Sequence, residues 1–354
     1  MSFFTCFFTL GCSLGLLLST RSLGIASVGA TTPFTSFEAE SGLPSGGAAV
    51  QKLITPPTDA YSSRVLEASG HAFVQLTATG QALTWTNTTT QSFTALNLRY
   101  AIPDAPGGGG IDATLNLYVD GVLRQSLNLN SHQTWLYENS TNYNGNDQNP
   151  ADGLPRVFYD DVHVFLAGAP LAPGSRLTLQ KDPTNAAAFY DLDVIDLETP
   201  PAPLSQPPNS LAITDYGAIA GDTNADNSNA IQSCLNAAQA QGRSVWIPPG
   251  VFYVKTLGGL NANGITIQGA GMWYSTIYRK VPLPNATPLG AIFNVTSCTV
   301  RNFALDANAT SRASLDGCGG GMDTSGVNWL ADSIWTQHTM SGFWASGVGG
   351  TVQN

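Results

Sequence analysis

The sequence has few charged residues, few cysteines and no long hydrophobic run. Only 11% of its 354 residues are charged, and the 14 Lys and Arg residues, set against 24 Asp and Glu residues, form no basic run. A net charge of −10 without a basic patch argues against nucleic acid or an anionic membrane as a partner, because both attract clustered cations. With 43% hydrophobic residues, the chain can still fill the cores of two ordinary domains.

The most apolar stretch, residues 3–18, is too short and too interrupted to predict a membrane-spanning helix. Small residues follow, and Val28-Gly29-Ala30 suits cleavage by a signal peptidase. We therefore predict a signal peptide over residues 1–30 and a secreted, extracellular protein that is free of the membrane after cleavage; a membrane anchor is the alternative. Secretion would make some Asn-x-Ser/Thr sequons usable for glycosylation. The candidates are Asn87, Asn139, Asn285, Asn294 and Asn308.

Cleavage would leave three cysteines, Cys234, Cys298 and Cys318, in an oxidising compartment. Cys234 has apolar neighbours at helical spacing, so we expect it on the buried face of a helix. Cys298 and Cys318 are the favoured disulfide pair, although the sequence alone does not determine the connectivity.

Five prolines within residues 199–208 predict an extended linker, because proline interrupts both helices and central strands. Before it, residues 33–198 alternate in short segments separated by Gly, Pro, Asn and Asp, which is typical of an antiparallel β-sandwich. After it, residues 209–354 form the second domain. The predicted fold class is therefore all-β.

The strongest local signal in the first domain is Asp120-Gly121, which separates the alternating segments Ala113–Val119 and Val122–Leu129. Both positions of a two-residue hairpin turn need positive φ, which Asp and Gly tolerate. We predict a β-hairpin with one apolar face in the core. That face comprises Leu115, Leu117 and Val119.

In the second domain, apolar spacing predicts a helix over Asn229–Gln241, ended by Gly242. Short strands then recur without helices between them, at Gly264–Gly269, Cys298–Leu305, Asn328–Trp335 and Gly350–Asn354. Their central residues Ile267, Val300, Leu330 and Val352 lie 33, 30 and 22 positions apart. Such a loose repeat is expected of stacked coils, with the helix closing one end.

Three segments that precede or contain the first of these coils, Asp215–Asp222, Asp226–Gln232 and Val245–Val254, resemble the start of a pectin-lyase-like β-helix. The resemblance implies a right-handed parallel β-helix with an N-terminal capping helix. Coils bury their apolar faces only against neighbours and need a cap at each end, and nothing caps the last strand at Asn354. We therefore expect an incomplete β-helix, from a truncated product or one covered by a partner.

The ends of the first domain, Phe37-Glu38-Ala39-Glu40 and Phe189–Glu198, resemble carbohydrate-binding modules of families 6 and 35, which are jelly-roll sandwiches. The resemblance implies that the first and last strands pair and hold a structural calcium ion through Glu38, Glu40 and Asp193. Carboxylate oxygens suit Ca²⁺. The alternative is that these acids face solvent from edge strands.

Sugars bind to aromatic rings that lie beside hydrogen-bonding groups. An Asn-rich loop with Trp135, Tyr137 and Tyr143 offers that mixture and is the predicted carbohydrate-binding site, with core packing of Trp135 as the alternative. Tyr159 with Asp160 and Asp161 is the second choice.

The order of these parts, together with Gly269–Tyr278 and Ile334–Trp344, resembles glycoside hydrolase family 87, the mycodextranases and α-1,3-glucanases. Met272-Trp273-Tyr274 and Gln337-His338-Thr339 are its more specific segments. The resemblance implies an inverting hydrolase of α-1,3-glucan or nigeran-type polysaccharide, such as that of fungal cell walls, with no cofactor for catalysis.

Glycoside hydrolysis uses two carboxylic acids, one to protonate the leaving oxygen and one to activate water or attack. The second domain offers Asp306, Asp316, Asp323 and Asp332, although single acids in Gly-rich loops usually cap turns. In family 87 the catalytic aspartates come from an Ala-Asp-Gly-like segment and a later Asp-Asp pair, and neither follows His338. We therefore assign no catalytic residue and expect the catalytic aspartates beyond Asn354.

His338 could shuttle protons near neutral pH, but we favour a histidine at a strand end that bonds to a neighbouring loop. Two rival functions remain. A polygalacturonase should carry Asn-Thr-Asp, Gly-His-Gly and Arg-Ile-Lys segments, none of which occurs, and a pectate lyase needs an Arg base near calcium-binding carboxylates, whereas Arg301 has no such cluster. The other rival is a non-catalytic glucan-binding protein.

Overall fold

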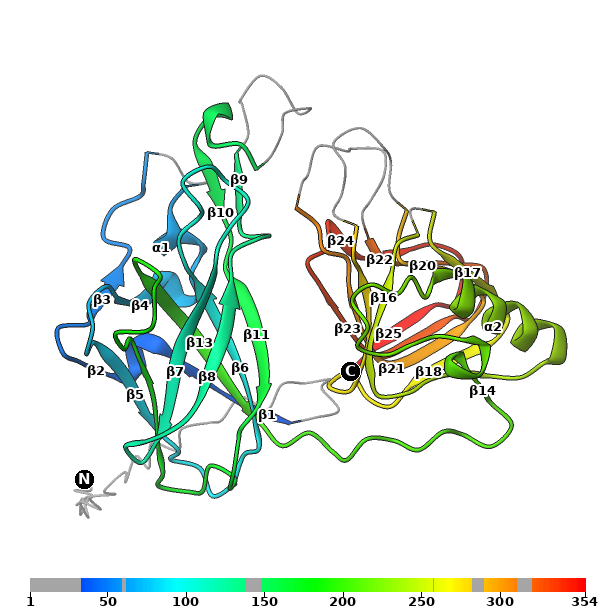
Figure 1. Cartoon of the computed structure of the whole chain (residues 1–354), viewed down its shortest axis with the longest axis horizontal. Helices are drawn as coiled ribbons and strands as arrows, with labels where there is room; N and C mark the ends of the chain where they lie inside the picture. Colours follow the sequence, from blue (N-terminus) through cyan, green and yellow to red (C-terminus); the bar gives the residue numbers. More distant parts are fainter. Residues whose placement is uncertain (1–32, 59–61, 138–147, 257, 282–289, 311–319) are drawn as a thin grey trace, which may run out of the picture.

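The computed structural model describes residues 33–58, 62–137, 148–256, 258–281, 290–310 and 320–354. The predicted signal peptide lies outside these ranges. In the described part of the chain, no helix is long and apolar enough to cross a membrane. Figure 1 shows two β-rich bodies joined by an extended segment, so the predicted β-rich fold class is confirmed.

The described residues between 34 and 198 form two large antiparallel sheets and one small one, and we call this part of the chain the antiparallel domain. One sheet holds, in spatial order, β11 (Asp160–Phe165), β6 (Ala95–Ala101), β13 (Tyr190–Glu198), β4 (Ala72–Leu76) and β3 (Ala49–Lys52), with β1 (Phe34–Glu38) also paired to β13. The other holds β2 (Leu43–Ser45), β5 (Ala82–Thr86), β12 (Arg176–Gln180), β7 (Asp112–Val119) and β8 (Val122–Asn130). The rest is a β9 (Trp135–Tyr137) and β10 (Pro155–Val157) pair, with short helices α1 (Arg64–Glu67), η1 (Ala39–Ser41), η2 (Ser69–His71) and η3 (Pro150–Asp152).

The predicted hairpin is β7 and β8. Asp120 and Gly121 have φ of 51° and 81°, as a two-residue turn requires. Leu115, Leu117 and Val119 are all buried in the core between the sheets. The first and last strands of the domain, β1 and β13, also pair as predicted.

The described residues between 211 and 353 form three parallel ladders, and we call this part of the chain the parallel domain. The first ladder is β14 (Leu211–Ala212), β15 (Val245–Ile247), β18 (Thr266–Gly269), β21 (Thr299–Asp306), β23 (Leu330–Gln337) and β25 (Thr351–Gln353). The second is β16 (Gly250–Val254), β19 (Ser275–Arg279) and the C-terminal halves of β21 and β23. The third is β17 (Leu260–Asn263), β20 (Phe293–Thr296), β22 (Gly320–Ser325) and β24 (Ser341–Ala345).

A helix closes the first coil of this domain. Helix α2 (Ser228–Gln241) follows η4 (Ile213–Tyr216) and ends at Gly242, whose φ of 61° is left-handed, as predicted. Its buried face packs on the apolar interior of the coils through Ile231, Cys234, Leu235 and Ala238. The predicted burial of Cys234 is thus confirmed.

The predicted repeat is correct in its strands but wrong by one residue in the third. Ile267 pairs with Val300, Val300 with Ala331, and Ala331 with Val352. Ala331 is therefore the buried residue, while Leu330 is half-buried. Because side chains alternate between faces, a shift of one residue exchanges the inward and outward positions.

The segment after β13 runs along the parallel domain. The Leu204 N–H donates to the Ala270 carbonyl at 2.8 Å, and the Tyr274 hydroxyl donates to the Pro201 carbonyl at 2.7 Å. The Trp273 indole N–H donates to Glu198 Oε2 at 3.2 Å. These contacts hold the two domains against each other.

Candidate functional site

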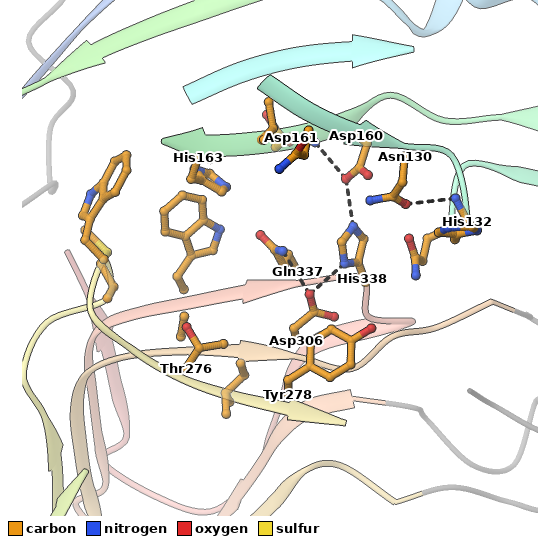
Figure 2. Close-up of a pocket in the computed structure, with 18 of the residues that line it drawn as sticks. Asn130, His132, Asp160, Asp161, His163, Thr276, Tyr278, Asp306, Gln337 and His338 are labelled. Atoms are coloured by element: carbon orange, nitrogen blue, oxygen red, sulfur yellow. Dashed lines mark hydrogen bonds and ion pairs between the residues drawn. The ribbon is translucent and has the colours of Figure 1, made fainter. Parts of the chain in front are cut away.

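A cavity of about 420 Å³ lies between the two domains. The antiparallel domain contributes residues from the end of β8 and from β11, and the parallel domain contributes residues from β19, β21 and β23. Its volume lies within the range of roughly 300–1,000 Å³ that is usual for small-molecule sites. Figure 2 shows side chains of both domains pointing into the same space.

The second ladder forms one wall of the cavity because its side chains alternate. In β19, Ile277 points into the coil, whereas Thr276 and Tyr278 point outward into the cavity. Tyr278 pairs in register with Asp306, and Asp306 with Gln337. The Gln337 amide donates to Asp306 Oδ2 at 3.0 Å. Burial, followed by the charge of Asp306, raises the pKa of Tyr278 to about 12, so its hydroxyl stays protonated.

His338 joins the two walls. Its Nδ1 lies 2.9 Å from Asp306 Oδ2 and its Nε2 lies 2.8 Å from Asp160 Oδ1 (Figure 2). Burial alone would lower the pKa of His338, but the hydrogen bonds to Asp160 and Asp306 raise it well above its usual value. An imidazolium can donate to both carboxylates at once. Our interpretation of a bond to a neighbouring loop was therefore wrong, since one partner lies on the adjacent coil and the other in the antiparallel domain.

Next to His338 and Asp160, the pKa values of Asp161 and His163 of β11 are shifted in opposite directions. Burial raises the pKa of Asp161 to about 6, with the Asn97 amide acting against it at 3.2 Å. Burial, followed by the charge of His338, lowers the pKa of His163 to about 3, so this imidazole is neutral. Neither ring nitrogen of His163 makes a well-formed hydrogen bond, although the Gln337 amide lies beside it.

Aromatic rings form another part of the wall. The Trp273 and Trp335 rings lie 5.9 Å apart, and His163 packs edge-on against both. Phe165 lies 5.2 Å from Trp273 and stacks on Tyr274 at 5.5 Å. Both tryptophans are half-buried and line the cavity, so they offer ring surface next to polar groups.

The cavity combines ring faces with hydrogen-bond acceptors and few cations. Its carboxylates are Asp160, Asp161 and Asp306, and among the described lining residues there is no lysine or arginine. Aromatic faces beside oriented polar groups suit ligands that have apolar faces and many hydroxyls. The arrangement can therefore bind a neutral polyhydroxylated molecule, whereas it is poorly suited to an anion.

The other candidate acids of the parallel domain do not join this site. Asp306 lies in the second ladder, Asp332 in the first and Asp323 in the third. Asp323 Oδ1 is buried without a hydrogen-bond partner, and burial raises the pKa of this carboxyl. Asp332 accepts a hydrogen bond from Asn354 at 2.7 Å. Asp316 lies outside the described residues. No two of the three described acids share a ladder.

The predicted carbohydrate-binding aromatic residues are held differently from our expectation. Tyr137 is 7% exposed and its hydroxyl donates to Asp104 Oδ2 at 2.7 Å. Trp135 is half-buried, and its indole N–H donates to the Ile102 carbonyl at 2.8 Å. Burial of Tyr137 leaves no ring face for a sugar, so the prediction was wrong for this residue. Tyr143 lies outside the described residues.

The predicted calcium ligands do not converge as a metal site. Asp193 forms an ion pair with Arg99 and accepts the Ser69 N–H at 3.0 Å. Glu38 and Glu40 each keep one buried carboxylate oxygen without a hydrogen bond. Within the described ranges, no group of three His, Cys, Asp or Glu residues is placed to hold a metal ion. Arg99 already pairs with Asp193, whereas the two buried oxygens of Glu38 and Glu40 remain available to a cation, so calcium binding stays a prediction.

The predicted disulfide is not supported. Cys298 is a free, buried thiol whose Sγ lies 3.3 Å from the Thr296 carbonyl oxygen, and Cys318 lies outside the described residues. Cys234 is also a free thiol. Both cysteines fill the apolar interior of the coils.

Two glycosylation candidates are buried, which contradicts their prediction as surface sites. Asn87 is 2% exposed, and its amide donates to the Gln91 carbonyl at 2.8 Å. Asn308 is 9% exposed. The Asn294 amide donates to the Gly258 carbonyl at 2.9 Å. Asn139 and Asn285 lie outside the described residues.

Comparison with known proteins agrees with the two-part organisation. Residues 31–199 match the family model "alpha-1,3-glucanase catalytic domain D1", and residues 210–330 match "rhamnogalacturonase A/epimerase, pectate lyase-like". The crystal structure of the Agl-KA catalytic domain superposes with a TM-score of 0.80 and 28% identity. It covers 92% of this chain, and the chain spans 57% of its length. The chain therefore resembles the catalytic domains of α-1,3-glucanases in its fold and in the sequence of its first domain.

Two further structures of family 87 catalytic domains have the same fold. One is an α-1,3-glucanase in complex with nigerose, with a TM-score of 0.71 and 23% identity over 92% of this chain and 56% of that one. The other is the catalytic unit of the thermostable enzyme from Streptomyces thermodiastaticus strain HF3-3, with a TM-score of 0.58 and 24% identity over 92% and 59%. No curated protein sequence matches the chain.

The segments behind the resemblance to family 87 meet at the cavity. Met272 and Trp273 line it from one coil, and Gln337 and His338 from another. Asp160 was only part of our second choice, and its pairing with His338, 178 residues away, could not be found from local pattern. The Asp-Asp pair at 160–161 was the one available signal.

Proposed function

We propose that the protein binds a neutral α-glucan of the α-1,3-glucan or nigeran type in the cavity between its domains and belongs to a glycoside hydrolase that cleaves this polymer. The observation that carries the proposal is the cavity itself. Trp273, Trp335 and Tyr278 provide ring surface beside Asp161 and Gln337, which can bond hydroxyls. The relatives in family 87 with nigerose and tetrasaccharide ligands support the same class of ligand.

The charge of the cavity favours a neutral glucan over pectin, the substrate class suggested by the pectate-lyase-like match. Polygalacturonate carries a carboxylate on each sugar. In the cavity it would meet Asp160 and Asp306, whose charges His338 only partly balances, and Asp161 as well. Like charges brought together at a binding site cost several kcal/mol.

We also propose that hydrolysis needs aspartates outside residues 1–354, acting by inversion as the family resemblance implies. Asp160 and Asp306 both pair with His338. Among the described lining residues this leaves only Asp161 as a carboxyl that no histidine holds, whereas hydrolysis needs two carboxyl groups. The chain spans 57% of the Agl-KA catalytic domain, and the aspartate patterns of the family do not follow His338.

The remaining parts of the proposal rest on sequence patterns. We propose secretion with removal of residues 1–30, a carbohydrate-module-like jelly roll for the antiparallel domain, and a right-handed parallel β-helix for the parallel domain. A structural calcium ion at Glu38, Glu40 and Asp193 is part of the same proposal. Mass determination of the mature protein expressed by a secreting host would test the cleavage.

The proposal is tested with insoluble α-1,3-glucan, nigeran and polygalacturonate particles. We expect residues 31–354 to sediment with the two glucans and to release no sugar, and a chain extended by the following coils to release oligosaccharides. Sedimentation with polygalacturonate alone would favour the pectin-active alternative. If the protein binds glucan but no extended chain releases sugar, a non-catalytic glucan-binding protein is favoured. The cavity alone would be sufficient for such binding.

A further inference from the structure

A second cavity adjoins the first, and the two share a wall. The second cavity has a volume of about 280 Å³ and, like the first, lies between the antiparallel and parallel domains. Both are lined by Gln133, Asp160, Asp161, Trp335, Gln337 and His338. The larger cavity continues toward Trp273 and Tyr278, and the smaller one toward Tyr159 and Met340. One interdomain groove is therefore divided in two.

Two contacts across the groove make the division. His338 reaches from the parallel domain to Asp160 of the antiparallel domain, with 2.8 Å between Nε2 and Oδ1. Next to it, the Gln133 amide of the antiparallel domain donates to Asn308 Oδ1 of the parallel domain at 2.8 Å. We call these four side chains the crossbar.

The crossbar is held in place from both sides. On the parallel domain, the Asp306 carboxylate accepts hydrogen bonds from His338 and Gln337 and from the Asn308 backbone N–H at 2.9 Å. On the other domain, Asp160 Oδ1 accepts its neighbour's backbone N–H at 2.8 Å, and Oδ2 lies 3.3 Å from the Tyr100 hydroxyl. Gln133 Oε1 is buried without a hydrogen-bond partner, so the charged contact between His338 and Asp160 is the firmer part of the crossbar. A neutral ligand could displace that contact only with the loss of several hydrogen bonds.

We propose that the crossbar determines how long a glucan segment the protein recognises, by closing one end of the larger cavity. This inference rests on the proposed function, because it takes the larger cavity as the glucan site. A sugar chain that fills the cavity from the Trp273 end meets Asp160 and His338 and goes no further. The protein then recognises the end of a chain or a short segment, and the smaller cavity stays out of reach.

Removing the crossbar should open the end of the larger cavity. Without the Asp160 and Gln133 side chains, the two cavities merge into one groove, and a longer chain can continue toward Met340. Asp160→Ala is the better opening change than removal of His338, because it leaves the His338 and Asp306 charges paired with each other. The alternative of deleting His338 would leave two carboxylates facing each other.

The test compares dissociation constants for α-1,3-linked glucose oligosaccharides of two to six units, measured by calorimetry with residues 31–354. For the unaltered protein we expect affinity to rise with length and then level off before six units. For Asp160→Ala/Gln133→Ala we expect it to keep rising, so that the longest oligosaccharide binds about tenfold more tightly than the length at which the unaltered protein levels off. The comparison uses the ratio of the dissociation constants for long and short oligosaccharides, because a general weakening of binding cancels in this ratio.

The matched control is Asp332→Ala/Gln353→Ala, which removes the same two residue types from the first ladder, away from the groove. It should keep the levelling of the unaltered protein. Thermal melting checks that each variant is folded, and the single change Gln133→Ala, which keeps the charged contact, should give an intermediate ratio if the double variant does not fold.

The outcomes separate the two claims. An unaltered length profile in the folded opening variant overturns the crossbar and leaves the proposed function standing. Affinity that keeps rising to six units in the unaltered protein has the same meaning. If no glucose oligosaccharide binds the unaltered protein at all, the proposed function fails, and the crossbar inference fails with it.

Discussion

Replacing His338 by alanine should destabilise the protein by about 3 to 5 kcal/mol, which is the usual cost of removing one partner from a buried charge pair. The His338 side chain is 14% exposed and that of Asp160 is 7% exposed, so solvent screens the charges little. Without the imidazolium, Asp160 and Asp306 face each other with no cation between them. Part of the loss should appear as weaker coupling between the two domains.

The pH dependence of the free energy of unfolding gives an independent test, because its direction is fixed by the raised pKa of His338. The pKa of His338 in the folded protein lies above the unfolded value of about 6.5. The stabilisation is therefore fully present below about pH 6.5 and is lost as the pH rises through the folded pKa. In that window, the difference in free energy of unfolding between the unaltered protein and His338→Gln should fall by up to about 1.4 kcal/mol per pH unit.

Urea unfolding followed by tryptophan fluorescence measures both quantities. His71→Ala is the matched control, because both histidines have a left-handed backbone, with φ of 48° at His338 and 55° at His71, but the His71 side chain is exposed. It should cost less than about 1 kcal/mol. A loss for His338→Ala no larger than that of the control, or a His338→Gln difference that is flat with pH, would refute the reasoning.

Three further results are expected. Trp335→Ala should weaken glucan binding about tenfold, measured by calorimetry, because it removes a ring face from the cavity. Trp344 is a 61% exposed residue of the third ladder, and Trp344→Ala should leave binding unchanged. Equal effects of the two changes would contradict the proposed binding site. Glucan affinity should rise as the pH passes about 6, where Asp161 ionises and becomes a better acceptor, and Asp161→Asn should abolish this rise. Tyr137→Phe should lower the free energy of unfolding by about 1 kcal/mol through loss of its bond to Asp104, with glucan binding unchanged; a loss of binding would restore Tyr137 as a contact residue.

Features set by neighbouring residues could be predicted from the sequence. The β7–β8 turn follows from Asp120-Gly121, and the end of α2 follows from Gly242, because positive φ limits which residues fit. The coil register was less secure. The insertions between coils vary in length, so Ala331 rather than Leu330 faces the interior.

The site could not be predicted because it forms between residues far apart in the sequence. Nothing near His338 indicates that Asp160, 178 residues away, supplies its second carboxylate. Composition also misled the choice of aromatic residues. Tyr137 lies in strand β9, next to an Asn-rich stretch of the sequence. Its ring is buried and its hydroxyl donates to Asp104 at 2.7 Å, and a sequence pattern does not distinguish such a tyrosine from one that stacks on a sugar.

The most direct test of the central claim compares the binding of a neutral and an anionic oligosaccharide to the interdomain cavity. Residues 31–354 are titrated with α-1,3-linked gluco-oligosaccharides and with oligogalacturonides of equal length, with and without Trp335→Ala. We predict saturable binding of the glucose ligand only, weakened by the substitution. Equal or tighter binding of the oligogalacturonide, or glucose binding that is indifferent to Trp335, would contradict a neutral-glucan site between the domains.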